Sequence, residues 1–296
     1  MNYPEQDHST PMVLGVRVDP LNMETAIARI SGLMQNVRKG YVCLIGVHGI
    51  AEAQSNSGLT RMFAGATLVV PDGMPTVWIG QLQGFREMER VAGPDLMLEV
   101  FNRCEFGDYR HFLYGGKKGV AEELRGALLC RFPKAQIVGT FTPPFRELTF
   151  DEEQSLASEL DALGVDILWV GISTPKQERF MSRMLPLLNS TLMFGVGAAF
   201  DYHTGRIKDS PRWVKRAGLQ WFHRLLQDPR RLFWRYVRSN SLFLWCLLLE
   251  ALNWHTRSPT GMTTAQLCAD SRVDELDYTS AQKVGLVEVE PASRSR

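Results

Sequence analysis

The sequence lacks three features that would mark common classes of protein. No Asp-x-Asp pair occurs among its 296 residues, so the carboxylate pair that usually clamps a metal on a nucleotide diphosphate has no candidate. No Cys-x-x-Cys pair occurs either, which leaves no zinc or dithiol redox motif. The longest apolar run extends from Leu242 to Leu249, well short of the roughly 20 residues that a membrane-spanning helix needs.

The charges nearly balance, with 33 Lys and Arg against 32 Asp and Glu, so composition gives no reason to expect nucleic-acid binding. The basic residues nevertheless concentrate between Arg206 and Arg238. The N-terminus is polar and acidic as far as His8 and shows no secretory signal. Together with the five scattered cysteines, this favours a reducing, cytoplasmic setting.

Short apolar runs alternate with segments of helical spacing between about Tyr41 and Gly197. Six of these runs are expected to be strands: Val42 to Val47, Thr67 to Val70, His111 to Tyr114, Gln136 to Val138, Ile167 to Val170 and Leu192 to Val196. The alternation predicts an α/β fold with a Rossmann-like, mostly parallel sheet flanked by helices. Ligands of such sheets bind beyond the carboxyl ends of the strands, so the turns after these runs form the candidate site.

Two of these turns carry candidate catalytic groups. Asp72 ends the second run and precedes Gly73, a position from which a carboxylate can act as a general base. His48 stands at the matching turn of the first run and can serve as base, acid or phosphate hydrogen-bond donor. On spacing alone, a turn-forming Asp-Gly and a histidine at a helix start are the more ordinary explanations.

A third turn contains Gly115 and Gly116, followed by Lys117 and Lys118 and then by a helical pattern. Close backbone approach, two positive charges and a helix N-terminus all favour a bound phosphate. The pattern is weak, because it lacks the spacing of a phosphate-binding P-loop.

The turn after the last run, from Gly197 to Asp201, supplies two further candidate binding residues, Gly197 itself and Asp201. Gly195 and Gly197 resemble a dinucleotide fingerprint only superficially. Phe200 replaces its last glycine, and the motif follows the last strand instead of the first. An NAD site is therefore rejected.

The turn after the fifth run carries Lys176, Gln177 and Glu178. Lysine can neutralise a diphosphate, whereas Gln and Glu can hydrogen-bond sugar, uracil or ribose groups. The same residues can instead form a helix capping box with Thr174.

Arg90 and Asp95 are also candidates for substrate binding, although they can equally form a structural ion pair with each other.

The chain changes character near Arg206, where a basic and aromatic segment predicts two helices in series. Asp228 and Pro229 mark the start of the second helix, in which Arg231, Arg235 and Arg238 share one face. Such a cationic, aromatic helix suits either a membrane surface or packing on its own domain. We therefore divide the chain into an α/β catalytic domain over 1–205, a basic helical appendage over 206–255 and a disordered tail over 256–296.

These motifs together resemble one family, the WecG/TagA/CpsF glycosyltransferases of bacterial surface polysaccharide synthesis. The resembling segments follow the order of the family and cover roughly Val42 to Tyr236: VVPDGMPTVW, ERVAGPDLM, FLYGGKKGVAE, DILWVGISTPKQE, GVGAAFDYHTGRIKDSPRW and GLQWFHRLLQDPRRLFWRY.

The resemblance implies a metal-independent, inverting transferase that needs no cofactor beyond its UDP-sugar donor. Its acceptor would be a polyprenyl-diphosphate-linked saccharide, and the enzyme would be cytoplasmic and peripherally attached to the inner membrane. The aspartate of the PDG motif is the family's proposed base, which here is Asp72. Three arginines of the appendage would bind the diphosphate, and Arg224, Arg231 and Arg235 match the pattern best. A homo-oligomer is left open.

Two departures from the family pattern limit what carries over. Gly46-Val47-His48 stands where many members have Thr-x-Asn, so His48 either replaces the asparagine or shares the base role with Asp72. The loop GTFTPPF from Gly139 to Phe145 replaces the usual GTxxGYF and leaves the donor sugar open among glucose, mannose, N-acetylmannosamine and its uronic acid. The alternative function is a non-catalytic, membrane-associated module that binds UDP in a polysaccharide assembly complex.

Overall fold

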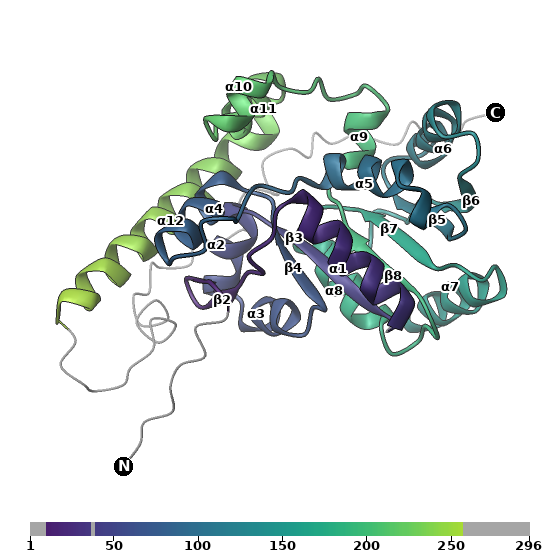
Figure 1. Ribbon diagram of the computed structural model, residues 1–296, viewed down its shortest axis with the longest axis horizontal. Coiled ribbons are helices and arrows are strands. Elements are labelled where there is room, and N and C mark those ends of the chain that lie inside the picture. Colours follow the sequence, from purple (N-terminus) through teal and green to yellow (C-terminus); the bar gives the residue numbers. More distant parts are fainter. Residues whose placement is uncertain (1–9, 37–38, 257–296) are drawn as a thin grey trace, which may run out of the picture.

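A computed structural model of the chain describes residues 10–36 and 39–256 (Figure 1). Its centre is a six-stranded sheet with the order β4-β3-β8-β7-β5-β6, in which every neighbouring pair is parallel. The strands are β3 (Gly40–Ile45), β4 (Leu68–Pro71), β5 (Arg110–Gly115), β6 (Gln136–Phe141), β7 (Ile167–Gly171) and β8 (Leu192–Gly195). A short antiparallel hairpin, β1 (Met12–Val13) with β2 (Val16–Arg17), stands apart from this sheet.

The strands are almost wholly apolar because both faces of the sheet are covered. Successive residues of β3 illustrate this: Cys43 packs into one core cluster, and Val42 and Leu44 pack into the other. On the first side lie α2 (Val47–Ser55), α3 (Ser57–Ala64), α4 (Met74–Leu82), α7 (Phe150–Ala162) and α8 (Lys176–Met184). On the second side lie α1 (Met23–Asn36), α5 (Gly93–Asn102), η1 (Cys104–Phe106), α6 (Val120–Arg131) and α9 (Ala199–His203).

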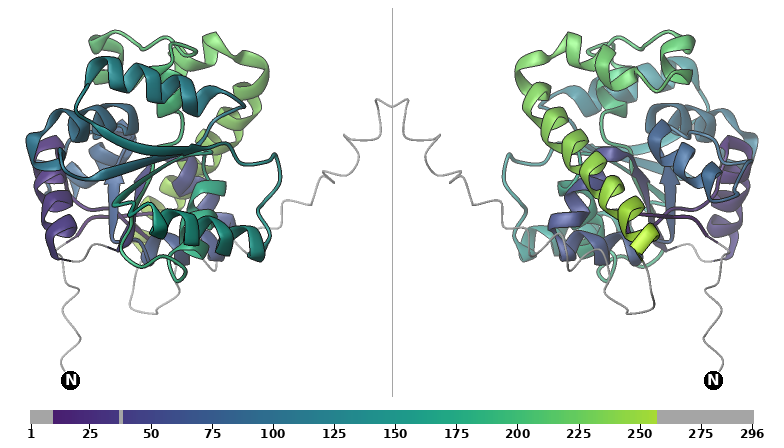
Figure 2. Two further views of the ribbon diagram at one scale, coloured as in Figure 1. Left: turned by 90° about the vertical axis from the view of Figure 1, so that its right-hand side faces the viewer. Right: turned by 90° about the vertical axis from the view of Figure 1, so that its left-hand side faces the viewer.

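The C-terminal segment forms α10 (Arg212–Arg216), α11 (Gln220–Gln227) and the long α12 (Pro229–Thr256). α12 packs along α2, and the right-hand view of Figure 2 shows it lying across that side of the molecule. One stripe of α12 is buried, formed by Leu232, Ser239, Phe243 and Cys246. Phe243 and Cys246 belong to the same core cluster as α2, so the helix is docked on the α/β domain.

The predicted fold class and all six predicted strands are confirmed, with shifts of up to three residues at their ends, the largest at the end of β6. The main difference is that Val47 begins α2 instead of ending β3. The start of α12 at Pro229 is confirmed, but the segment before it holds two helices where one was expected. Gly218, at φ +70°, separates them, because a residue in the left-handed region ends a helix.

None of the helices that the structure describes combines the length and the apolar content required to cross a bilayer. The tail assigned to 256–296 lies outside the described residues, apart from Thr256 at its start.

Candidate active site

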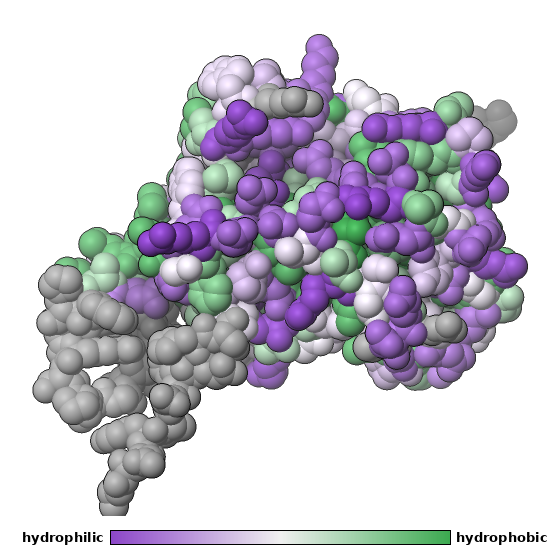
Figure 3. Space-filling model, in the orientation of Figure 1, coloured by the Kyte–Doolittle hydropathy of each residue, from purple (hydrophilic) through white to green (hydrophobic). Residues whose placement is uncertain are grey.

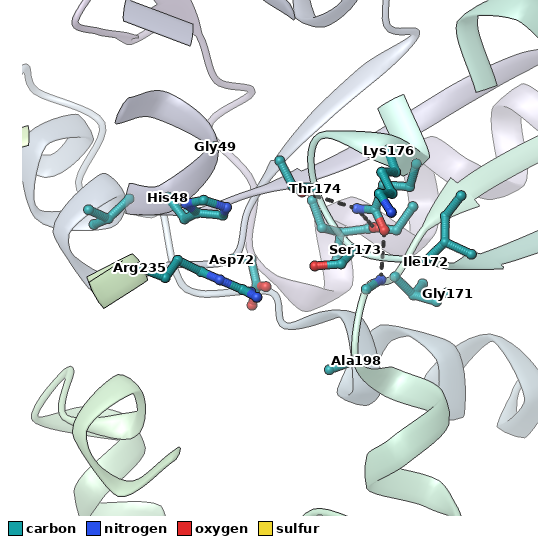
Figure 4. A pocket seen from close by; sticks show the side chains of 18 of the residues that line it. His48, Gly49, Asp72, Gly171, Ile172, Ser173, Thr174, Lys176, Ala198 and Arg235 are labelled. Atoms are coloured by element: carbon teal, nitrogen blue, oxygen red, sulfur yellow. Dashed lines mark hydrogen bonds between the residues drawn. The ribbon is translucent and has the colours of Figure 1, made fainter. Parts of the chain in front are cut away.

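A cleft of about 1130 Å³ opens at the carboxyl ends of the strands. The turns after β3, β4, β5, β7 and β8 form its floor, the loop between β6 and α7 forms one wall, and α4, α11 and α12 form the other. In Figure 4 His48, Asp72 and Arg235 lie on one side of this cleft, and Ser173, Thr174 and Lys176 lie on the other. Parallel strands bring their carboxyl ends to one edge, which explains why the predicted turns meet here.

Asp72 lies in the cleft directly after β4, where its N–H donates to the Ile45 carbonyl at 2.9 Å and fixes the turn to β3. Arg90 binds both the backbone and the side chain of Asp72. Its Nε donates to the Asp72 backbone oxygen at 2.6 Å, and one of its terminal nitrogens lies 3.2 Å from Asp72 Oδ1. Burial raises the pKa of the Asp72 carboxyl, and Arg90 opposes that rise. A carboxylate with raised pKa and one oxygen free of Arg90 can accept a proton from a substrate hydroxyl.

Asp95 does not pair with Arg90, so the structural ion pair considered from the sequence is wrong. Its carboxylate lies 3.6 Å from the Lys215 ammonium, and Asp95 is not among the residues that line the cleft.

His48 lines the cleft from the first turn of α2, but it is not hydrogen-bonded to Asp72 in the described structure. Its Nδ1 lies 2.9 Å from the hydroxyl of Ser239 on α12, and that hydroxyl donates to the Arg235 carbonyl at 2.8 Å. Burial lowers the pKa of His48, and the charge of Arg235 lowers it further, so the ring is neutral near pH 7. His48 thus connects the catalytic domain to the helix that carries the arginines.

The turn between β7 and α8 divides its polar residues between the cleft and the interior. Lys176 faces the cleft. Gln177 also lines the cleft but is buried, and it bridges to the next turn, since its Nε2 donates to the Gly195 carbonyl at 3.1 Å and its Oε1 accepts from the Gly197 N–H at 3.1 Å. It therefore shapes the glycine turn after β8, and both Gly197 and Asp201 line the cleft beyond it.

Glu178 is fully buried and does not line the cleft. Its Oε1 accepts hydrogen bonds from the Thr174 hydroxyl at 2.8 Å and from Gln177 Nε2 at 3.1 Å, while burial raises the pKa of its carboxyl. These bonds join side chains and leave the helix backbone uncapped: Pro175 is the N-cap of α8 and offers no side-chain hydrogen bond. The capping-box alternative is therefore wrong.

The two glycines after β5 differ in their roles. Gly116 lines the cleft together with Lys117 and Lys118, whereas Gly115 does not. A Cβ on Gly115 would stand 2.5 Å from the Gly171 oxygen, so glycine there allows β5 and β7 to pair to their ends.

The helical wall supplies Arg224 from α11 and Arg231 and Arg235 from α12, and all three line the cleft. Arg224 Nε is buried and has no hydrogen-bond partner within the described part of the chain. Burial lowers the pKa of Arg235, and the neighbouring charges of Arg224 and Arg231 add to this effect. Of the three, Arg231 is ion-paired, with Asp228 at 2.5 Å. Three arginine side chains gathered in one cleft suit a bound polyanion.

Sequence reasoning missed several residues of the cleft. Tyr202 follows Asp201 and lies under Arg224, whose guanidinium carbon is 6.0 Å from the ring centre, and Tyr236 follows Arg235. Ser239 was missed as well, although it falls four residues after Arg235 and hence on the same helix face. Within 10–36 and 39–256 no group of three or more His, Cys, Asp or Glu side chains is placed to hold a metal ion.

Comparisons with known proteins agree with the resemblance. The profile described as the Glycosyl transferase WecG/TagA/CpsF family matches residues 11–257. An N-acetylglucosaminyldiphosphoundecaprenol N-acetyl-beta-D-mannosaminyltransferase of Bacillus subtilis (strain 168) is 27% identical over 198 residues, which are 67% of this chain and 75% of the relative. The enzyme of the same name from Bacillus spizizenii is 27% identical over 197 residues, 67% of this chain and 74% of the relative.

Proposed function

Since the chain belongs to the WecG/TagA/CpsF family of glycosyltransferases, we propose that it transfers a hexose or hexosamine-type sugar from a UDP-sugar to a polyprenyl-diphosphate-linked saccharide. The observation that carries this proposal is a half-buried carboxylate of raised pKa, Asp72, in the same cleft as Arg224, Arg231 and Arg235. The relatives are named for transfer to a diphosphoundecaprenol-linked sugar, which supports an acceptor of that class.

The proposed reaction is a single displacement. An acceptor hydroxyl oxygen attacks the anomeric carbon of the donor, Asp72 takes the hydroxyl proton, and the bond from that carbon to the UDP oxygen breaks with its electron pair. Attack from the face opposite UDP inverts the anomeric configuration. Negative charge develops on the departing diphosphate. The positive charges of Lys176, Arg224, Arg231 and Arg235 in the cleft would stabilise that charge without a metal.

The apolar part of the cleft supports a lipid-linked acceptor. Trp78 and Leu82 of α4 and Leu244 of α12 line the cleft and are exposed, Leu82 to 88%. These side chains offer apolar contact to the isoprene units next to an acceptor diphosphate that the arginines bind.

The outer face of α12 supports peripheral attachment to the cytoplasmic face of the inner membrane. Trp234 is 74% exposed, and several other large apolar side chains along the helix are exposed with it: Phe233, Trp245, Leu248 and Leu252. In Figure 3 hydrophobic surface gathers at the edge where α12 runs. Aromatic and leucine side chains beside arginines are typical of helices that lie in a membrane interface.

The test is an assay of UDP release from several UDP-sugars, with EDTA present and a short-chain polyprenyl-diphosphate sugar as acceptor. Asp72→Asn should abolish acceptor-dependent release and leave UDP binding, measured by calorimetry, nearly intact. Asp108→Asn, an exposed aspartate outside the cleft, is the matched control and should remain active. Full activity of Asp72→Asn would remove Asp72 as the base. UDP binding without transfer from any donor would favour the non-catalytic module.

A further inference from the structure

Phe145 lines the cleft, yet its side chain is 100% exposed. It stands in the loop between β6 and α7, directly after Pro143 and Pro144. An exposed phenylalanine forgoes the stabilisation that burial of its ring would bring. Exposure inside a ligand cleft therefore points to a partner that covers the ring when it binds.

The exposure does not come from a loosely held loop, because ion pairs anchor the chain just beyond Phe145. The Glu147 carboxylate lies 2.8 Å from one nitrogen of Arg183 on α8, and another nitrogen of Arg183 lies 2.8 Å from the buried Glu153 of α7. Arg146 makes two bonds to Glu152, at 2.6 and 2.7 Å, and Glu152 also completes the capping box that starts α7. The backbone on the α7 side of Phe145 is thus fixed to both helices.

The surroundings of Phe145 are cationic. The Lys176 ammonium lies 4.9 Å from the centre of the ring, and Lys117, Lys118 and Arg146 line the same cleft. The apolar wall belongs to the opposite end of the sheet: β6 is one edge strand, and β4, which leads into α4, is the other. Phe145 is therefore separated from the surface suited to an isoprenoid chain.

A flat ring beside a lysine matches a nucleoside diphosphate, which presents a planar base linked to negatively charged phosphates. Every nucleobase has a π-face that can stack on an aromatic side chain, and such stacking contributes substantially to binding. A donor whose base lies at β6 would extend its diphosphate over the turns after β5, β7 and β8, toward Asp72 after β4, in the order of the strands.

We propose that Phe145 is the base-stacking residue of the donor site and that its ring covers the uracil of UDP while Lys176 binds the diphosphate. This inference rests on the proposed function, because it takes a UDP-sugar as the donor.

The experiment is calorimetric titration of the full chain with UDP and, separately, with inorganic pyrophosphate, which lacks the base. Phe145→Ala should weaken UDP binding about tenfold and leave pyrophosphate binding unchanged, whereas Phe145→Trp should restore it. Lys176→Ala should weaken both ligands. Phe150→Ala is the matched control, since Phe150 is 62% exposed at the start of α7 and does not line the cleft.

Native affinity for UDP in Phe145→Ala would overturn the stacking role and leave the proposed function untouched. An equal loss for UDP and pyrophosphate would overturn it too, because it would show a general disturbance of the anion site. Failure of the native chain to bind UDP at all would instead overturn the proposed function together with this inference. A thermal melt of each variant confirms that it is folded, which a fully exposed position should permit.

Discussion

The link between His48 and Ser239 is a polar contact that joins α12 to the catalytic edge, and Ser239→Ala tests it. Ser239 is 3% exposed and bonded both to His48 Nδ1 and to the Arg235 carbonyl. The Arg235 carbonyl keeps its place in the helix when the hydroxyl is removed. His48 Nδ1, in contrast, loses its partner in a half-buried position.

The expected loss of stability follows from this difference between the two partners of the Ser239 hydroxyl. A buried polar group left without a partner costs about 1–3 kcal/mol, whereas removal of both partners costs much less than the sum. We expect Ser239→Ala to lower the free energy of unfolding by about 1–2 kcal/mol and the double variant with His48→Ala to show a coupling energy of about 1 kcal/mol. Because the next turn of α12 carries Arg235, the same variant should raise the KM for a diphosphate-linked acceptor more than it lowers kcat.

Urea unfolding of the two single variants and the double variant measures the coupling, and initial rates measure KM and kcat. Ser241→Ala, two residues along the helix and exposed, is the control and should behave as the native chain. His48→Asn should retain most of the stability, since an asparagine amide can occupy the position of Nδ1. Additivity of the single variants to within about 0.3 kcal/mol would refute the idea that this bond docks α12.

Four further predictions concern pH and the space around the backbone. Burial raises the pKa of the Asp72 carboxyl in the folded protein. The stability that the protonated carboxyl contributes is complete below the ordinary pKa of 3.8 and is lost as pH rises through the raised pKa. Asp72→Asn should therefore increase the melting temperature at pH 7, and a decrease would contradict this. The rate of the native enzyme should likewise fall as pH drops through that raised pKa in a pH–rate profile, because a base must be ionised. Burial lowers the pKa of His111 from 6.5 to about 3. The stability that the neutral ring contributes is complete above pH 6.5, and about 2 kcal/mol of it should be lost by pH 5, which urea unfolding at the two pH values would measure. The stability of a His111→Phe variant should depend less on pH. Gly115→Ala should cost about 1–3 kcal/mol in the same assay because its Cβ meets the Gly171 oxygen, whereas Gly126→Ala, in open space on α6, should not destabilise the protein.

The sheet was predictable because each strand is a short apolar run that closes on Gly, Pro or Asp, and because parallel topology sends all those ends to one edge. For the same reason Asp72, Lys176 and Gly197 were expected in one place, and all three line the cleft. The arginines followed from helical spacing combined with the family pattern.

The failures share a different cause, since each depended on which way a polar side chain turns. Glu178 and Lys176 are two residues apart at the start of one helix, yet one is fully buried and the other faces the cleft. Arg90 pairs with Asp72 instead of the nearer Asp95, and His48 pairs with Ser239, which is 191 residues away. Contacts between residues so far apart in the sequence produce no periodic pattern from which they could be predicted.

The position of β8 also bears on how the chain folds. It is the last strand in the sequence, yet it lies between β3 and β7 and separates the pair β4-β3 from the trio β7-β5-β6. Until residue 195 leaves the ribosome, the nascent chain can form only two partial sheets with β3 and β7 as exposed edges. We expect amide protection in pulsed hydrogen exchange to appear late at these two strands and together with that of β8, so the floor of the cleft forms only when the sheet closes.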